Sequence, residues 1–430
     1  MSIQKVKRQL CHNHTMNTFT LIFIAALAIS VSVRMWLAQR HLRYVASHRN
    51  AVPAAFTDAI TLTQHHKAAD YTLAKTRLSF LQIIVEAAVL LAFTLGGGLQ
   101  WLDTALSGAY SSEMLRNTLL ITSVMVIGAA IELPMDLYRK FVIENRFGFN
   151  AMTLKRFLID SLMQVTIGAL LGLPLLFVVL WLMQAAGSLW WLYTWLVWVA
   201  FNLTLLAIYP TFIAPLFNRF EPMENGTLKS RIEQLLKKCG FTAQGLFVMD
   251  GSKRSSHGNA YFTGFGKTKR IVLFDTLLKH LETDEVEAVL AHELGHFKRR
   301  HVIKRMVWIF TASLAFLWVL NWLMTQSWFF SGLNVTSQTT GMALVLFFLV
   351  LPVFTFLLQP LSSLYSRKHE FEADQYAAVQ TQAHSLISAL TKLYRDNAST
   401  LTPDPLYAMF YNSHPDAQQR IARLQTAAHN

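Results

Sequence analysis

Long apolar stretches separated by more polar segments dominate this chain. A stretch can cross a bilayer as a helix if it has about 20 mostly apolar residues. Seven stretches meet that requirement, at residues 18–37, 79–97, 118–138, 157–183, 189–213, 306–326 and 341–363. The pattern therefore predicts a mainly α-helical membrane protein with about seven transmembrane helices.

Acidic side chains interrupt the apolar pattern inside three of these spans. Glu86 lies in the second span, Glu132 and Asp136 lie in the third, and Asp160 lies in the fourth. An ionisable group facing lipid near the bilayer centre costs roughly 3 kcal/mol or more. Glu86 and Glu132 therefore predict a polar, water-filled chamber between the helices. For Asp136 and Asp160, a position at the lipid headgroups is an equally good interpretation.

A more polar segment, residues 214–305, separates the fifth span from the sixth. Residues 228–238 predict an amphipathic helix. Three short β-like runs follow, at residues 246–249, 260–262 and 271–274. The last two runs predict a hairpin. We expect Thr283 to be the N-cap of a further helix, for which a straight course into the sixth span is one option.

The helix that follows Thr283 contains the motif HELGH at residues 292–296. Residues four positions apart lie on one face of a helix, so His292 and His296 can bind one metal ion. Glu293 lies beside them, where it can take a proton from a water activated by zinc. The motif predicts one Zn²⁺ per chain and a zinc metalloendopeptidase.

A third zinc ligand must come from elsewhere in the chain. A histidine six residues after His296 would complete a known pattern, but Val302 occupies that position and His301 comes one residue too early. Glu370, just after the last span, is the better candidate. Asp374 shares a helix face with Glu370 and can orient a ligand histidine.

Glu372 lies between Glu370 and Asp374, and a position on a solvated surface fits it better than a role at the metal. The basic run that follows the motif, Lys298 to Arg300, also places the zinc site at or beyond the membrane surface, because such charges would be prohibitive inside lipid.

The spans and motifs together divide the chain into four parts. These are 1–213 with the first five spans, a zinc-peptidase region at 214–305, the last two spans at 306–363, and a C-terminal peptidase part at 364–430.

Composition and charge agree with a membrane protein. Hydrophobic residues make up 53% of the chain and charged residues 15%. The net charge of +13 fits loops that face anionic lipid better than it fits nucleic acid. We therefore expect membrane lipids as partners and no nucleic acid. The two cysteines, Cys11 and Cys239, are too few for a disulfide framework.

Several sequence motifs together resemble the type I CAAX prenyl protease family. They are FVIENRFGFN (141–150), PLFN (215–218), DGSKRSSHGNAYF (250–262), HELGH (292–296), EFEAD (370–374) and SHP (413–415). The resemblance covers most of the chain. It implies seven helices around a large chamber, with an α+β zinc-peptidase domain closing its cytoplasmic end.

The resemblance also implies roles for individual residues. His414 is expected near the oxyanion as a catalytic residue, and Arg420 is expected beside it as a substrate-binding residue. Asn259 and Ala260 are expected on a strand edge that pairs with the extended backbone of a substrate.

The implied function is hydrolysis of peptide bonds in membrane-associated, amphipathic or prenylated CAAX-type polypeptides. Two alternatives are a heat-shock-type quality-control metalloprotease and a non-proteolytic channel or transporter with structural zinc. Glu293 argues against a structural zinc site, which has no need of a general base. A bacterial inner membrane is favoured as the location, or the endoplasmic reticulum if the chain is eukaryotic.

Lys and Arg residues gather in alternate loops. The segments 38–78, 139–156, 214–305 and 364–430 each carry several, whereas the loops between them carry only Arg116. Basic residues mark cytoplasmic loops. The asymmetry predicts that the C-terminus and the candidate peptidase region lie in the cytoplasm, although the basic residues before the first span run against it.

Cysteine labelling of intact cells tests this orientation, with single cysteines at Ser337 and Ser399 in a background without Cys11 and Cys239. An impermeant reagent should label position 337 and spare position 399, because only position 337 is expected outside. Labelling of position 399 with position 337 protected would reverse the orientation.

Overall fold

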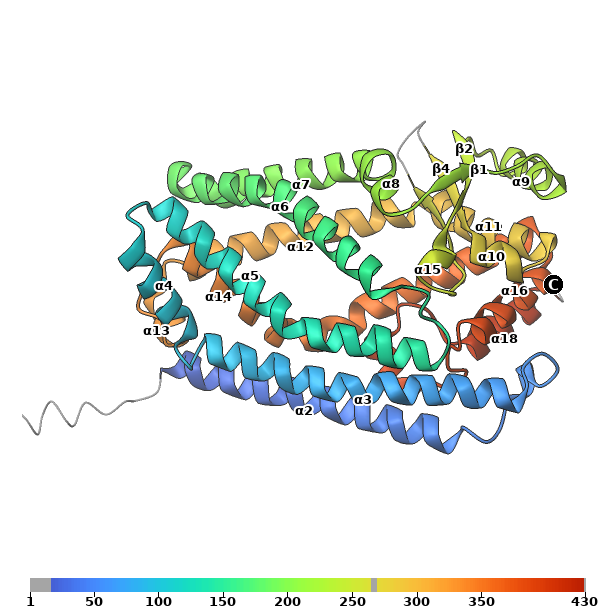
Figure 1. Cartoon of the computed structure of the whole chain (residues 1–430), viewed down its shortest axis with the longest axis horizontal. Coiled ribbons are helices and arrows are strands. Elements are labelled where there is room, and N and C mark those ends of the chain that lie inside the picture. Colours follow the sequence, from blue (N-terminus) through green and yellow to red (C-terminus); the bar gives the residue numbers. More distant parts are fainter. Residues whose placement is uncertain (1–16, 264–268, 429–430) are drawn as a thin grey trace, which may run out of the picture.

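The computed structural model describes residues 17–263 and 269–428, and it is mostly helical (Figure 1). Within these residues seven helices are long and apolar enough to cross a membrane, which confirms the predicted number. They contain α2 (Thr18–Ser47), α3 (Leu62–Phe93), α5 (Glu113–Tyr138), α6 (Leu154–Ala185), α7 (Trp190–Ile208), α12 (His301–Leu323) and α14 (Thr340–Thr355), and the last of these spans runs on from α14 as far as Gln380. The segment 98–117, which was expected to be a loop, also contains a helix, α4 (Gly98–Ala109).

Several spanning helices are longer than their apolar windows. The helix α3 has 32 residues, which corresponds to about 48 Å at the helical rise of about 1.5 Å per residue. A hydrocarbon core is only about 30 Å thick, so one end of such a helix extends into water. The helix α14 likewise continues, through a 3-10 turn at Phe356–Leu358, into the polar helix α15 (Gln359–Gln380). This continuation carries Glu370 out of the bundle.

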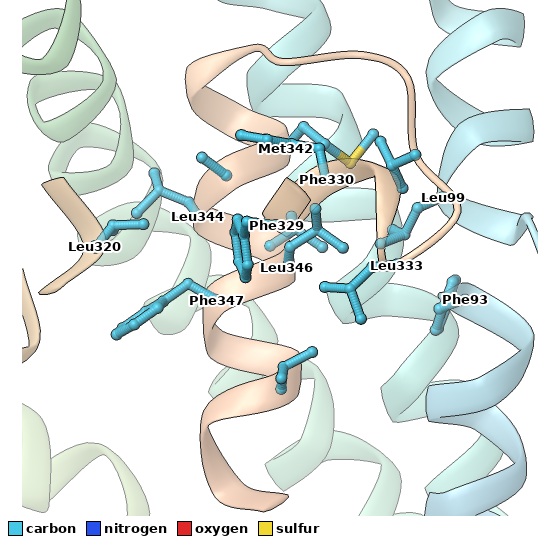
Figure 2. Packing of buried hydrophobic residues seen from close by; sticks show 14 of the residues in the cluster. Phe93, Leu99, Leu320, Phe329, Phe330, Leu333, Met342, Leu344, Leu346 and Phe347 are labelled. Carbon is cyan, nitrogen blue, oxygen red and sulfur yellow. The ribbon is translucent and has the colours of Figure 1, made fainter. Parts of the chain in front are cut away.

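One end of the helical bundle is held by a dense hydrophobic core (Figure 2). Phe329 and Phe330, from the short helix α13 (Ser327–Ser331), are buried against Met342 and Leu346 of α14. In Figure 1, α4 and α13 lie at the end of the molecule opposite to the strands. Tight apolar packing at this end contrasts with the polar interior nearer the strands.

A cavity of about 950 Å³ lies between α2, α3, α5 and α14. The charged side chains that line it are Arg34, Glu86, Glu132, Asp136 and Arg139. Arg34 donates a hydrogen bond to Glu86 at 2.7 Å, so one acid is neutralised by a cation from the neighbouring span. The chamber predicted from Glu86 and Glu132 is therefore confirmed, and Asp136 faces it as well.

The remaining elements form an α+β unit at the other end of the bundle (Figure 1). A four-stranded mixed sheet has the order β1-β2-β4-β3, in which β2 and β4 are parallel and the other pairs are antiparallel. The strands are β1 (Phe220–Pro222), β2 (Gly245–Met249), β3 (Ala260–Thr263) and β4 (Arg270–Phe274). The predicted antiparallel pairing of the last two strands is confirmed, and their connection at 264–268 lies outside the described residues.

Short helices surround the sheet. They are α8 (Ala214–Phe217), α9 (Thr227–Lys238), α10 (Asp275–His280), α11 (Thr283–Lys298), α16 (Ala383–Asp396), α17 (Pro405–Tyr411) and α18 (Ala417–Ala428). One hydrophobic cluster joins segments from both sides of the last two spans, since Ile232 and Leu273 share it with Leu386 and Leu424. An ion pair fixes this unit to the bundle: Arg254 donates to the Asp160 carboxylate at 2.9 and 3.1 Å.

Both ends of α11 differ from the prediction. Its N-cap is Glu282, not Thr283, because the side chains of Glu282 and Glu285 cap each other's backbone in a capping box. At its other end α11 does not run straight into the sixth span. Arg300 adopts a left-handed conformation with φ of 57°, and the new helix α12 begins at His301.

The helices α11 and α15 approach each other closely at Gly295. A Cβ atom at this position would lie 2.9 Å from the Cα atom and 3.1 Å from the carbonyl oxygen of Ala373. Backbone atoms cannot move aside as a flexible side chain can, so only glycine permits this separation of the two helices.

Gly295→Ala should therefore destabilise the protein by about 1–3 kcal/mol, because the added methyl group overpacks the contact between the helices. The measurement is the thermal-unfolding midpoint of the purified protein, compared with Gly172→Ala in α6, where an added Cβ would meet nothing within 4 Å. The control should be neutral or slightly stabilised, because alanine favours a helix over glycine by about 0.5–1 kcal/mol. Equal midpoints for the two variants would contradict the close contact.

Candidate active site

His292 and His296 project from one face of α11 towards α15. The other face of α11 packs into the hydrophobic cluster around the sheet through Val286, Leu290 and Leu294. This packing fixes the rotation of the helix about its axis. The imidazole of His292 is buried and that of His296 is half-buried, both on the side that faces Glu370.

The three predicted zinc ligands meet at one point. The Nε2 atoms of His292 and His296 lie 3.2 Å apart. Glu370 places Oε2 at 3.4 Å from His292 Nε2 and Oε1 at 3.3 Å from His296 Nε2. Glu370 Oε2 is buried and has no hydrogen-bond partner among the described residues. A buried carboxylate oxygen without a donor is costly unless a cation occupies the space beside it.

The spacing of these donor atoms fits a metal ion. In a tetrahedral site with bonds of about 2.0–2.1 Å, neighbouring donor atoms lie about 3.3–3.4 Å apart. The two imidazole nitrogens lie 3.2 Å apart, close to that edge length, and one ligand atom from each of the three residues can be chosen so that all lie within 4.8 Å of one another. Two imidazoles and a carboxylate form a donor set suited to zinc, and three protein ligands leave a fourth position for water or substrate.

Asp374 contacts the other ring nitrogen of His292. Its Oδ1 atom lies 2.8 Å from His292 Nδ1. Arg420 in α18 in turn donates two hydrogen bonds to Asp374, at 2.6 and 2.8 Å. Burial alone would lower the pKa of His292, but the nearby carboxylates of Asp374 and Glu370 outweigh burial and raise the pKa to about 9. The surroundings of His292 therefore favour a positive charge, which a metal cation also supplies.

Glu293 is half-buried beside the three donors and forms no side-chain hydrogen bond within the described part of the chain. Burial raises the pKa of its carboxyl above the usual value, although the imidazoles of His292 and His296 act in the opposite direction. A carboxylate with a raised pKa and free oxygens is suited to accept a proton from a nearby water.

His414 borders the same centre from the loop after α17. Its Nε2 atom lies 3.5 Å from Glu370 Oε1, and its side chain is 62% exposed. Ser413 Oγ lies 3.0 Å from the other ring nitrogen and helps to orient the ring. Two cavities, of about 650 and 610 Å³, are both lined by His414. The imidazole is thus placed where a ligand in either cavity could reach it.

Asn259 and Ala260 lie at the start of β3, which is an edge strand of the sheet. Ala260 pairs with Leu273 of β4 on one side, and the Asn259 carbonyl accepts a hydrogen bond from Phe274. The other side of β3 pairs with no strand in the described sheet. Its position agrees with the strand edge expected from the sequence.

The surroundings of Arg420 and Glu372 add to the sequence-based interpretation, and those of Glu372 differ from it. Arg420 was expected beside His414 at the substrate; its side chain is 7% exposed and bonded to the Asp374 carboxylate, and it lines the same cavity as His414. Glu372 was expected on a solvated surface, but it lies 3.0 Å from the Nε2 atom of His301. His301 in turn contacts His296 at 3.0 Å. In the sequence, the contact between His301 and His296 is indicated by the position of His301, which comes one residue before the place where a third histidine ligand would lie.

The fold and this centre define a class: a multi-span membrane protein with a metallopeptidase site at one end of its helical bundle. Two family profiles match the chain. The profile described as CAAX prenyl protease N-terminal, five membrane helices, matches residues 41–219, and the profile of peptidase family M48 matches residues 222–428. The chain belongs to peptidase family M48 and is a membrane metalloendopeptidase.

Individual relatives are similar over nearly the whole chain. "CAAX prenyl protease 1 homolog" of Caenorhabditis elegans is 33% identical, over 94% of this chain and 97% of the relative. The homologue of the same name in Arabidopsis thaliana is 34% identical, over 87% and 90%. The crystal structure of S. mikatae Ste24p aligns with a TM-score of 0.87 at 32% identity, over 95% of this chain and 99% of that one.

Proposed function

We propose that this protein is a zinc-dependent endopeptidase that hydrolyses prenylated, CAAX-type or otherwise membrane-associated polypeptides. The observation that carries the proposal is the meeting of three donor side chains, with one ligand atom from each within 4.8 Å of the others, beside the carboxylate of Glu293. The names of the similar proteins support the substrate class, since they are CAAX prenyl proteases. A CAAX sequence ends a polypeptide and carries the lipid on its cysteine.

His292, His296 and Glu370 would hold one zinc ion. When bound, zinc would polarise the scissile carbonyl and lower the pKa of a water. Glu293 takes the proton from the attacking water, and its raised pKa makes it a better proton acceptor at neutral pH than an ordinary glutamate. The same carboxyl can then return the proton to the leaving amine.

The other site residues position the substrate and stabilise charge. His414, exposed at the edge of the centre, donates a hydrogen bond to the oxygen on which negative charge develops. The free edge of β3 at Asn259 and Ala260 pairs with the extended substrate backbone. We assign Arg420 to holding Asp374, and so to orienting His292, because its guanidinium is bonded to that carboxylate and buried.

The location of the site supports a substrate drawn from the membrane. We propose that residues 214–305 and 364–430 form one peptidase unit, because the zinc ligands come from both segments. This unit faces the cytoplasm, as the distribution of Lys and Arg suggests. The chamber of about 950 Å³ within the bundle would receive part of a lipidated or amphipathic polypeptide.

Two substitutions separate proton transfer from charge stabilisation. Glu293→Gln keeps the shape of the side chain but cannot accept a proton, so kcat should fall about 100-fold or more while zinc stays bound. His414→Ala should lower kcat with little change in zinc content or peptide affinity, because its contact forms in the transition state. Mass spectrometry of prenylated CAAX peptides incubated with the purified variants gives the cleavage rates.

Glu287→Gln is the matched control, since Glu287 lies on the same helix but pairs with Arg231, away from the donor atoms. It should cleave at the wild-type rate. If Glu293→Gln did the same, the proton-transfer role would be wrong. If no prenylated or unprenylated peptide were cut by the zinc-loaded wild type, the proposed function itself would fail.

A further inference from the structure

His296 has a second polar contact that the proposed reaction does not use. Its Nδ1 atom, which faces away from Glu370, lies 3.0 Å from His301 Nδ1. The other ring nitrogen of His301, Nε2, lies 3.0 Å from Glu372 Oε2. His301 is only 4% exposed and Glu372 is 28% exposed. A continuous chain of hydrogen bonds therefore runs from the metal site, through a buried imidazole, to a partly exposed carboxylate.

One arrangement of protons satisfies every contact in this chain. To bind a metal, His296 Nε2 must present a lone pair, so the proton of a neutral His296 ring is on Nδ1. His301 Nδ1 must then accept that proton in a hydrogen bond, which leaves the His301 proton on Nε2. His301 Nε2 donates to the carboxylate of Glu372, which can only accept. The three residues thus define the tautomer of His296.

The backbone explains why His301 can reach His296 although they are only five residues apart. In a continuous helix with 3.6 residues per turn, residue 301 would project from a different face of the helix than residue 296. Instead α11 ends at Lys298, Arg300 turns with positive φ, and α12 begins at His301. The His301 ring is also stacked on His369, with 3.9 Å between the ring centroids, which fixes its plane.

We propose that His301 and Glu372 are positioning residues that hold His296 in the tautomer and orientation needed for zinc, a role that rests on His296 being a zinc ligand as proposed above. They would do for His296 what Asp374 and Arg420 do for His292. Groups that fix a ligand histidine in this way typically contribute about 10–100-fold to metal affinity. The pair also ties α12, a membrane span, to the metal site.

Zinc affinity tests the proposal directly, by competition with a chelator on the purified full-length protein. His301→Phe keeps a ring that can stack on His369 but removes both nitrogens, so the Kd for zinc should rise about 10–100-fold. His301→Asn should recover most of this loss, because its amide oxygen can accept the hydrogen bond from His296 Nδ1. His369→Phe is the matched control, since it changes only the stacked ring and should bind zinc as the wild type does.

Glu372→Ala gives a second route if His301→Phe does not fold. Loss of the carboxylate releases His301, so zinc affinity should again fall, whereas Glu287→Ala on α11 should leave it unchanged. Wild-type zinc affinity in His301→Phe or in Glu372→Ala would overturn the proposal. So would a failure of His301→Asn to bind zinc better than His301→Phe.

These results are distinguishable from a failure of the proposed zinc site. If the double variant His292→Ala, His296→Ala keeps its zinc, the ligand assignment is wrong and the positioning role falls with it. If that double variant loses zinc while His301→Phe binds zinc normally, the ligands are right and only the role of His301 and Glu372 is wrong. Neither outcome depends on peptide cleavage.

Discussion

The close packing of α11 against α15 is the constraint on which the rest of the site depends. The two histidines come from one helix and the carboxylate from the other, and a separation of 3.3 to 3.4 Å between their atoms tolerates little displacement. Gly295 permits the helices to approach to that distance, since any larger residue would press on the backbone of Ala373. The apolar face of α11 and the capping box at Glu282 hold the helix in the required rotation.

Three spans link the metal site to the membrane. The helix α15 continues from α14, α12 begins at His301 beside His296, and Asp160 of α6 anchors Arg254 of the peptidase unit. The charged groups inside the bundle lie around one cavity, where water and ion pairing reduce the cost of burying them in a membrane. Tyr411 lines both this cavity and the cavity of about 650 Å³ that His414 lines, so the polar space extends towards the proposed hydrolytic centre.

Much of this could be predicted from the sequence. Seven apolar stretches identified the spans, because hydropathy over about 20 residues depends little on tertiary contacts. The spacing of His292 and His296 placed them on one helix face, and the EFEAD motif at 370–374 supplied the third donor. The chamber was predicted from Glu86 and Glu132, because an acidic side chain within an apolar span is costly if it faces lipid and so tends to face the interior of the bundle.

The errors have different physical origins, two of them local and one in a tertiary contact. Thr283 is a good N-cap by residue type, yet Glu282 caps the helix, because the side chains of Glu282 and Glu285 form a capping box in its first turn. The helix breaks at Arg300, which adopts a left-handed backbone conformation although it is neither glycine nor asparagine. The residue type at this position therefore does not predict the break. Glu372 looked solvated because its partner, His301, is 71 residues away in the sequence.

The most direct test of the central claim is X-ray absorption at the zinc edge, on the purified wild type and on His296→Ala. The account predicts nitrogen and oxygen donors at about 2.0–2.1 Å with two imidazoles in the wild type, and no sulfur at about 2.3 Å. In His296→Ala any zinc that remains should show one imidazole fewer. A sulfur donor, or an unchanged number of imidazoles in His296→Ala, would contradict the site built between α11 and α15.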